Sequence, residues 1–257
     1  MSIQNIVFLI VLLFVVVHVL FYFKTAKSID VIECGIHQGK TYIEKLLRLK
    51  QPLHFKVGDS QKEKEKRMNS DEHVLVKTSG ENGYKRIKHS VIEEYLRENK
   101  GTYSEHNHDF MAEKTNEQLV SILKPKLAVN GQTDYIIIDK ESEYPIKRQF
   151  YDVSVFHVVS GKCNVTLFSP VNDFIPSVNP IMLEQTIKRE KTGGTKRTEV
   201  QLETSDCLSV PPHWFVRLES SEPTRIIRYT FHTPFSVIGN LHYIVPHMLS
   251  IYNKDKT

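Results

Sequence analysis

The chain has 257 residues, of which 40% are hydrophobic, and a formal net charge of +4. This length supports one sizeable core, and the small positive charge is too diluted by acidic residues to indicate nucleic-acid binding. The three cysteines, Cys34, Cys163 and Cys207, are an odd number without zinc-site spacing, so we expect no disulfide framework and no zinc site.

The first apolar run predicts a membrane anchor. Residues 6–23 contain no charged side chain, and at about 1.5 Å per helical residue they extend about 27 Å, close to the ~30 Å hydrocarbon core. A cleaved signal peptide is the alternative, but no basic residue precedes the run and no small-residue cleavage site follows it. We therefore expect residues 1–27 to form a single-pass transmembrane anchor with a basic flank, and residues 28–257 to form a soluble domain.

The charge that follows the anchor predicts its orientation. Residues 24–56 contain seven Lys or Arg and three acids, which gives +4, so this segment accounts for the whole net charge of the chain. Basic residues beside a membrane span tend to stay in the cytosol, so we expect the soluble domain on the cytosolic side. The same residues can contact anionic headgroups.

The segment after the anchor reads as helix, strand, loop and helix. Residues 39–50 carry apolar side chains at helical spacing, and Pro52 ends that helix and leads into an alternating strand at 53–57. Residues 58–72 are highly charged and predict a surface loop. A second amphipathic helix is expected at 90–99.

Beyond Pro125 the pattern changes to alternation, which predicts a mainly β domain with flanking helices. The predicted strands are Tyr135–Asp139, Asp152–Val159, Cys163–Phe168, Thr198–Glu203, Cys207–Val210, Trp214–Leu218 and Ile226–His232. The basic stretch 188–197 predicts a solvated loop tip, with an anionic partner as the alternative. A last helix is expected at 236–252, kinked at Pro246.

Two segments carry more than periodicity. Residues 156–170 read as a strand, a tight turn at Gly161, a second strand and a Leu-Phe-x-Pro exit. Residues 205–215 read as a polar turn, a short strand and a Pro-Pro corner that leads to the aromatic pair Trp214 and Phe215.

Together these segments resemble the JmjC-type, cupin-like domains of the Fe(II)/2-oxoglutarate oxygenase superfamily. Earlier pieces follow in the order that the family has, with an entry helix and strand at 42–52 and a helix and tyrosine at 87–103. The resemblance covers most of residues 33–235. It implies a double-stranded β-helix, the cupin or jelly-roll-like fold.

The resemblance also implies where an iron site would lie. The family binds iron with a His-x-Asp/Glu pair and a distal His. Its spacing from Gly161 places the pair at Arg148 and Phe150, and the distal His, which follows the aromatic pair in the family, corresponds to Val216. None of these side chains binds iron. The lysine that often holds 2-oxoglutarate in the family is replaced by Cys163. We therefore expect the oxygenase chemistry, its iron and its cosubstrate to be absent.

The remaining histidines allow other sites. His106 and His108 are spaced as a metal clip, although two neighbouring histidines are more often surface residues. His157 and His213 lie on or beside the motif strands, where each either faces the pocket or has a structural role. An enzyme with a rebuilt metal site would use these side chains.

Arg148 is the third candidate. If it projects inward, it either binds a carboxylate or pairs with an internal acid such as Glu203 or Asp206, and we favour the internal pair. The residues expected around the pocket are Arg148, His157, Cys163, His213 and Trp214.

These observations favour a membrane-anchored, catalytically inactive cupin-like domain that acts as a structural or interaction module. Its expected partners are the lipid bilayer, through residues 6–23, and a protein that the sequence does not identify; no cofactor is expected. Anchored proteins with decayed cupin-like domains also occur in large DNA viruses, so a virion or host membrane is a plausible setting. The alternatives are an oxygenase-type enzyme with a rebuilt metal site and a small-anion-binding cupin that uses Arg148.

Overall fold

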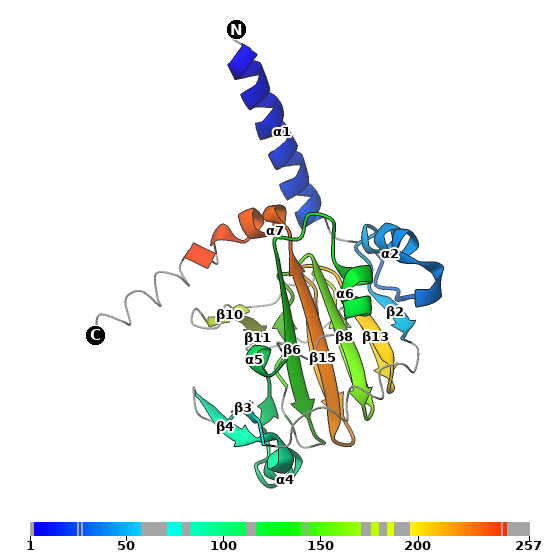
Figure 1. Ribbon diagram of the computed structural model, residues 1–257, viewed down its shortest axis with the longest axis vertical. Coiled ribbons are helices and arrows are strands. Elements are labelled where there is room, and N and C mark those ends of the chain that lie inside the picture. Colours follow the sequence, from blue (N-terminus) through cyan, green and yellow to red (C-terminus); the bar gives the residue numbers. More distant parts are fainter. Residues whose placement is uncertain are drawn as a thin grey trace, which may run out of the picture.

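Helix α1 (Ile3–Phe23) projects from one end of a β-rich domain (Figure 1). The computed structural model describes residues 3–24, 26, 28–57, 71–78, 83–111, 117–140, 142, 144–170, 176–179, 184–187, 196–242 and 244–245. Within these ranges, α1 is the one helix that is long and apolar enough to cross a membrane. It contains the predicted anchor, and most of its large apolar side chains are exposed, as a lipid-facing helix requires.

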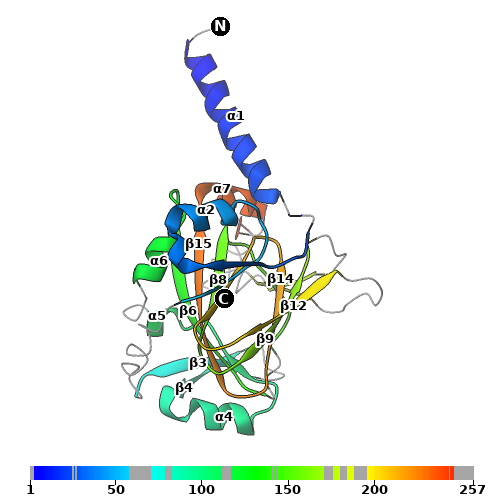
Figure 2. The ribbon, with the colours of Figure 1, turned by 90° about the vertical axis from the view of Figure 1, so that its right-hand side faces the viewer.

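The described strands form two sheets (Figure 2). One sheet contains, in spatial order, β1 (Ile32–Gly35), β2 (Leu53–Lys56), β13 (Asp206–Val210), β8 (Val153–Ser160), β15 (Thr224–His232), β6 (Asn130–Ile138), β5 (Tyr103–Ser104), β3 (His73–Lys77) and β4 (Tyr84–Lys88). The other contains β10 (Pro176–Asn179), β11 (Glu184–Ile187), β7 (Lys147–Arg148), β14 (Phe215–Ser220), β9 (Cys163–Phe168) and β12 (Arg197–Leu202). All pairs are antiparallel except β1 with β2.

Short helices surround the sheets. They are η1 (Ile36–Gln38), α2 (Lys40–Leu47), η3 (His89–Val91), α4 (Ile92–Glu98), α5 (His108–Met111), α6 (Glu117–Leu123) and α7 (Pro234–Gly239). Helices α4 and α6 bury Ile92 and Leu123, among other side chains, against the outer face of the nine-stranded sheet. This face therefore belongs to a core of its own, separate from the space between the sheets.

The second core fills the space between the two sheets. Strands of both sheets contribute to it, and Trp214, which is fully buried, packs there with Phe156, Val158, Leu167 and Leu208. The sequence predicts that these five side chains share one core, and the structure confirms it. Strand β8 is buried on both faces because alternate residues enter the two cores.

The turn at Gly161 joins β8 to β9 as predicted. Its φ is +85°, a left-handed value that glycine adopts without strain. A Cβ at this position would lie 2.6 Å from the carbonyl oxygen of Pro223 and from Oγ1 of Thr224. Glycine is therefore needed here for space as well as for conformation.

Most predicted elements are present. Each of the seven strands predicted after Pro125 overlaps an observed one, and the strand predicted at 53–57 corresponds to β2. The helices predicted at 39–50 and 90–99 correspond to α2 and α4. The last helix begins earlier than expected, at Pro234, because the Thr233 side chain caps its first turn. Most of the loop at 58–72, most of the basic stretch at 188–197, and Pro246 lie outside the described residues.

Candidate functional site

Strand register determines which side chain of β7 faces the space between the sheets. Val216 of β14 is fully buried in that space and lies opposite Lys147. Directly opposed residues share a face, so Lys147 points inward, whereas Arg148 and its partner Phe215 point outward. The family resemblance places Arg148 at an iron-ligand position, but the side chain of β7 that points between the sheets is that of Lys147.

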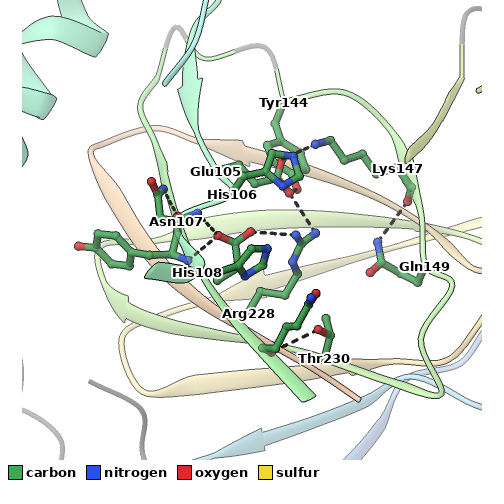
Figure 3. Close-up of polar contacts among 12 residues, drawn as sticks. Glu105, His106, Asn107, His108, Tyr144, Lys147, Gln149, Arg228 and Thr230 are labelled. Atoms are coloured by element: carbon green, nitrogen blue, oxygen red, sulfur yellow. Dashed lines mark hydrogen bonds and ion pairs between the residues drawn. The ribbon is translucent and has the colours of Figure 1, made fainter. Parts of the chain in front are cut away.

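Lys147 belongs to a buried ionic network centred on Glu105 (Figure 3). The ammonium group of Lys147 contacts Oε2 of Glu105, and Arg228 Nη1 lies 3.0 Å from Oε1. The hydroxyl of Tyr144 donates to the same Oε1 at 2.9 Å, and Arg228 Nη2 donates to Asp134 Oδ2 at 2.8 Å. Two acids and two bases therefore meet in one place, and their formal charges cancel.

The network is shielded from water. Glu105 is 0% exposed and Arg228 is 7% exposed, and the rings of Tyr103 and Tyr144 lie 5.3 and 5.0 Å from the ammonium of Lys147. Burial by itself raises the pKa of Glu105, but Lys147, Arg228 and His106 outweigh it and hold that pKa below its usual value. The carboxylate is therefore ionised, with charged partners on both of its oxygens.

A second group beside the network has the composition of a metal site. One ligand atom each from His106, His108 and Asp134 lie within 4.8 Å of one another. Nδ1 of His108 lies 2.9 Å from the carbonyl oxygen of Thr133, which can only accept, so Nδ1 carries a hydrogen and Nε2 is the nitrogen that a neutral ring would offer to a metal. Ligating histidines commonly have this arrangement.

Asn107, which lies between the two histidines in the sequence, ties this segment to Asp134 and Tyr135 of β6. Its amide nitrogen donates to the carbonyl of Tyr135 at 2.6 Å, and its backbone N–H donates to Asp134 Oδ1 at 2.7 Å. His106 takes a left-handed φ of 65°, which is uncommon for a residue other than glycine. The sequence suggests His106 and His108 as a pair of metal ligands, but nothing in it indicates that Asp134 lies beside them.

Arg148 and His213 meet on the outer side of β7 and β14, near the end of the anchor. Arg148 Nη2 donates to Nδ1 of His213 at 3.1 Å, and the guanidinium lies over the rings of Phe150 and Phe215. Burial, with Arg148 and Lys50 nearby, lowers the pKa of His213 to about 3, so its ring is neutral and accepts this bond.

The acids proposed as partners of Arg148 have other contacts. Glu203 pairs with Lys162 at 2.9 Å, and Asp206 lies 3.5 Å from Lys56. The favoured pairing of Arg148 with Glu203 or Asp206 is therefore wrong, because those side chains extend toward lysines elsewhere in the fold.

The other expected pocket residues are divided between the two cores. Cys163 and Trp214 lie in the core between the sheets, whereas His157 lies opposite Cys207 and Ile227, which belong to the outer core. Burial raises the pKa of Cys163 to about 12, so its thiol stays protonated and is not a nucleophile near neutral pH. The structure therefore does not bring the five expected residues into one pocket.

The C-terminal end of α1 is attached to the domain beside Arg148 and His213. Tyr22 is 1% exposed, its hydroxyl donates to the carbonyl of Phe150 at 2.6 Å, and it accepts from Asn240 Nδ2 at 2.7 Å. The rings of Tyr22 and Phe23 pack against His213, with centroids 4.7 and 5.2 Å away. The last turn of the anchor is therefore packed against the domain.

Val216 and Lys147 lie between the sheets at or beside the positions that the resemblance gives to iron ligands. Val216 has no lone pair, and Lys147 is already paired with Glu105. A scan against protein-family models and a search of curated proteins both find no match to this chain.

Proposed function

We propose that this chain is a membrane-anchored, non-catalytic cupin-like module whose role is to hold a protein partner at a bilayer. The fold assignment is supported by strand order. From β6 to β15 the chain passes repeatedly between the two sheets, with β13-β8-β15-β6 in one and β7-β14-β9-β12 in the other. A double-stranded β-helix, or jelly roll, has this alternation.

The observation that carries the non-catalytic assignment is the buried pairing of Lys147 with Glu105. An iron site needs converging neutral or anionic donors and open coordination positions. At this place the domain has an ammonium group in contact with a carboxylate, and a fully buried valine lies opposite it. A cation there would meet Lys147 and Arg228 at short range, and both repel it.

The anchoring assignment is supported by α1 and by its junction with the domain. The helix is long and apolar enough to cross a bilayer, and Tyr22 is hydrogen-bonded to the domain at its end. The basic flank favours the cytosolic side for the domain. A domain attached in this way is held close to the membrane surface, as a scaffold requires.

The proposal is tested by purifying the full-length chain from its native membrane after chemical crosslinking. The control is a chain of residues 1–27, which keeps the anchor and the first basic residues after it but lacks the β-domain. We expect a protein that is captured only by the full-length chain, and no conversion of 2-oxoglutarate to succinate by the purified protein with Fe(II). Turnover of 2-oxoglutarate, or the same captured proteins from both chains, would contradict the proposal.

A second candidate function is metal binding by His106, His108 and Asp134. The specific observation in its favour is the protonated Nδ1 of His108, which leaves Nε2 available beside a buried carboxylate. Against it, Arg228 already binds that carboxylate. Calorimetric titration with Zn(II) or Mn(II) decides: a micromolar site that is lost in His108→Ala, but kept in the exposed His73→Ala control, supports it. The absence of saturable binding contradicts it.

A further inference from the structure

A pocket of about 470 Å³ lies where the anchor meets the domain. The anchor contributes Val17, His18, Phe21 and Tyr22 to its wall. The domain contributes residues of α2 and the turn after it, of the start of β8 and the residue before it, of the end of α6 and its connection to β6, and of the start of α7. The pocket is therefore at the level where α1 leaves the domain.

One wall of the pocket is apolar and belongs to the membrane-spanning helix. Val17 and Phe21 are exposed on α1, and Phe235 of α7 stacks on His18 with ring centroids 4.5 Å apart. An acyl chain that runs beside α1 would meet this wall along its length. The remaining walls belong to the domain and contain charged side chains.

The charged side chains of the pocket have an excess of cations. Its lining contains three basic and two acidic residues, Arg48, Lys50, Lys126, Glu44 and Asp152. Lys50 lies 3.9 Å from Asp152 and Lys126 lies 3.9 Å from Glu44, so each acid has a lysine beside it. Arg48 is exposed and supplies the excess positive charge.

The cations differ in how accessible they are. Lys50 is only 8% exposed, and its ammonium lies 5.5 Å from the ring centre of Phe21 on the anchor. The side chain of Lys126 is 76% exposed, and Arg48 also faces solvent. Arg48 and Lys126 can therefore reach a ligand, whereas Lys50 joins the anchor to the domain.

The exposed apolar residues of the domain are concentrated at the same end. Outside α1, and within the described ranges, they lie on α2 and its C-terminal end, on the connection from α6 to β6, and on α7 and the residues after it, except for Val91 beside α4. They are Tyr42, Leu49, Leu127, Val129, Ile238, Leu241 and Val245. Figure 1 shows these elements gathered at the end that carries the anchor, with α4 at the opposite end.

A bilayer explains the apolar wall on α1, the excess of cations in the pocket and the exposed apolar residues at the same end of the domain. Where a transmembrane helix leaves the hydrocarbon, lipid phosphates lie beside it and acyl chains run along it. Basic side chains near that level attract anionic headgroups, and apolar side chains enter the interface. A water-facing end of a domain would gain nothing from this combination of exposed apolar residues and cations.

We propose that the pocket binds one anionic phospholipid of the anchoring bilayer, with its phosphate at Arg48 and Lys126 and an acyl chain against Val17 and Phe21. This inference rests on the proposed anchoring and adds a ligand to it. The bound lipid would fill the pocket between α1 and the domain and help to orient the domain on the membrane.

The test uses the full-length chain in phosphatidylcholine nanodiscs that contain a small share of photoactivatable phosphatidylserine. After illumination, mass spectrometry locates the lipid adducts on the chain. We expect adducts in residues 40–50 and 120–130. Each cation near a membrane surface contributes about 1 kcal/mol to the binding of anionic lipid. The double variant Arg48→Glu with Lys126→Glu should therefore reduce the yield of these adducts by roughly tenfold or more.

The matched control reverses two exposed cations, Arg86 and Lys88 of β4, by substitution with glutamate, and it should leave the adducts unchanged. Equal labelling of all three chains, or labelling confined to other segments, would overturn the proposal. Competition by millimolar inorganic phosphate would replace the lipid with a free anion as the ligand and would also overturn it. Failure of the chain to enter nanodiscs is seen before illumination and would refute the anchoring itself.

Discussion

The two faces of the nine-stranded sheet differ in the charge of their buried ionisable side chains. On the inner face, Arg228 keeps its charge because Glu105 and Asp134 contact its guanidinium, and those acids hold its pKa well above the usual value against the effect of burial. On the outer face, His157 is 2% exposed and burial lowers its pKa to about 4, so it is neutral. Partners, and not depth, decide whether a charge survives burial in this domain.

The largest loss of stability is expected when the ionic network of Glu105, Lys147 and Arg228 is broken. Glu105→Gln removes the negative charge between Lys147 and Arg228 and leaves two buried cations with less compensation. Breaking a buried ion pair on one side typically costs roughly 3–5 kcal/mol, so we expect a loss of that size in the free energy of unfolding. Trp214 is the single tryptophan and is fully buried, so its fluorescence reports denaturant unfolding of the full-length chain in detergent.

The control for this prediction is Glu203→Gln, which breaks the exposed pair with Lys162 and should have no measurable effect. Lys147→Met combined with Glu105→Gln should recover part of the loss, because the second change removes one of the uncompensated charges. A Glu105→Gln variant as stable as the wild type would show that the inner charges are not held by their pairing.

The next largest loss of stability is expected when the apolar packing between the two sheets is disturbed. Trp214→Ala should lower the free energy of unfolding by roughly 3–5 kcal/mol, the usual cost of deleting a large buried aromatic side chain. Trp214→Phe keeps most of the packing and should cost clearly less. Circular dichroism measures both variants, and an alanine variant that unfolds at the wild-type denaturant concentration would argue against this packing.

The outer face predicts a dependence on pH. The folded pKa of His157, about 4, lies below the ordinary histidine value of 6.5, so the unfolded chain binds more protons between these values. The free energy of unfolding should therefore fall as the pH falls through this window, by up to about 3 kcal/mol from this residue. His157→Gln should reduce the slope of the profile in this window, while the buried His213 keeps its own share; an unchanged slope would show that His157 is not buried neutral.

The junction with the anchor gives the smallest effect. Tyr22→Phe keeps the ring against His213 and removes the hydroxyl that joins Phe150 and Asn240. We expect a local loss of about 1 kcal/mol, seen as faster hydrogen exchange in residues 234–240 and not in β8. Unchanged exchange in α7 would mean that the hydroxyl does not hold the junction.

The sequence predicts the strands because their alternation and turn residues are local signals. The Gly161 turn and the shared burial of Trp214 with Phe156 could be predicted because these residues belong to the two motifs at 156–170 and 205–215. The ionic network could not be predicted in the same way. Glu105 and Arg228 are far apart in the sequence, and each looks like an ordinary surface charge until the fold brings them together.

The site at β7 shows a second limit. Spacing from Gly161 selects Arg148, but a shift of one residue reverses the face of a strand, and the register places Lys147 inward. Counting along a sequence cannot resolve that difference. Asp134 escapes notice for a related reason, since only the antiparallel pairing of β6 with β15 places it beside Arg228.

In the cupin-like fold that we propose, paired charges and packed side chains occupy the place where an iron site would lie. The most direct measurement is calorimetric titration of the full-length chain in nanodiscs with 2-oxoglutarate in the presence of Mn(II). We predict no saturable binding tighter than the millimolar range, or about −4 kcal/mol. A one-to-one micromolar site for 2-oxoglutarate that requires Mn(II) would show that this place is open to a metal and its ligand, and would contradict the proposal.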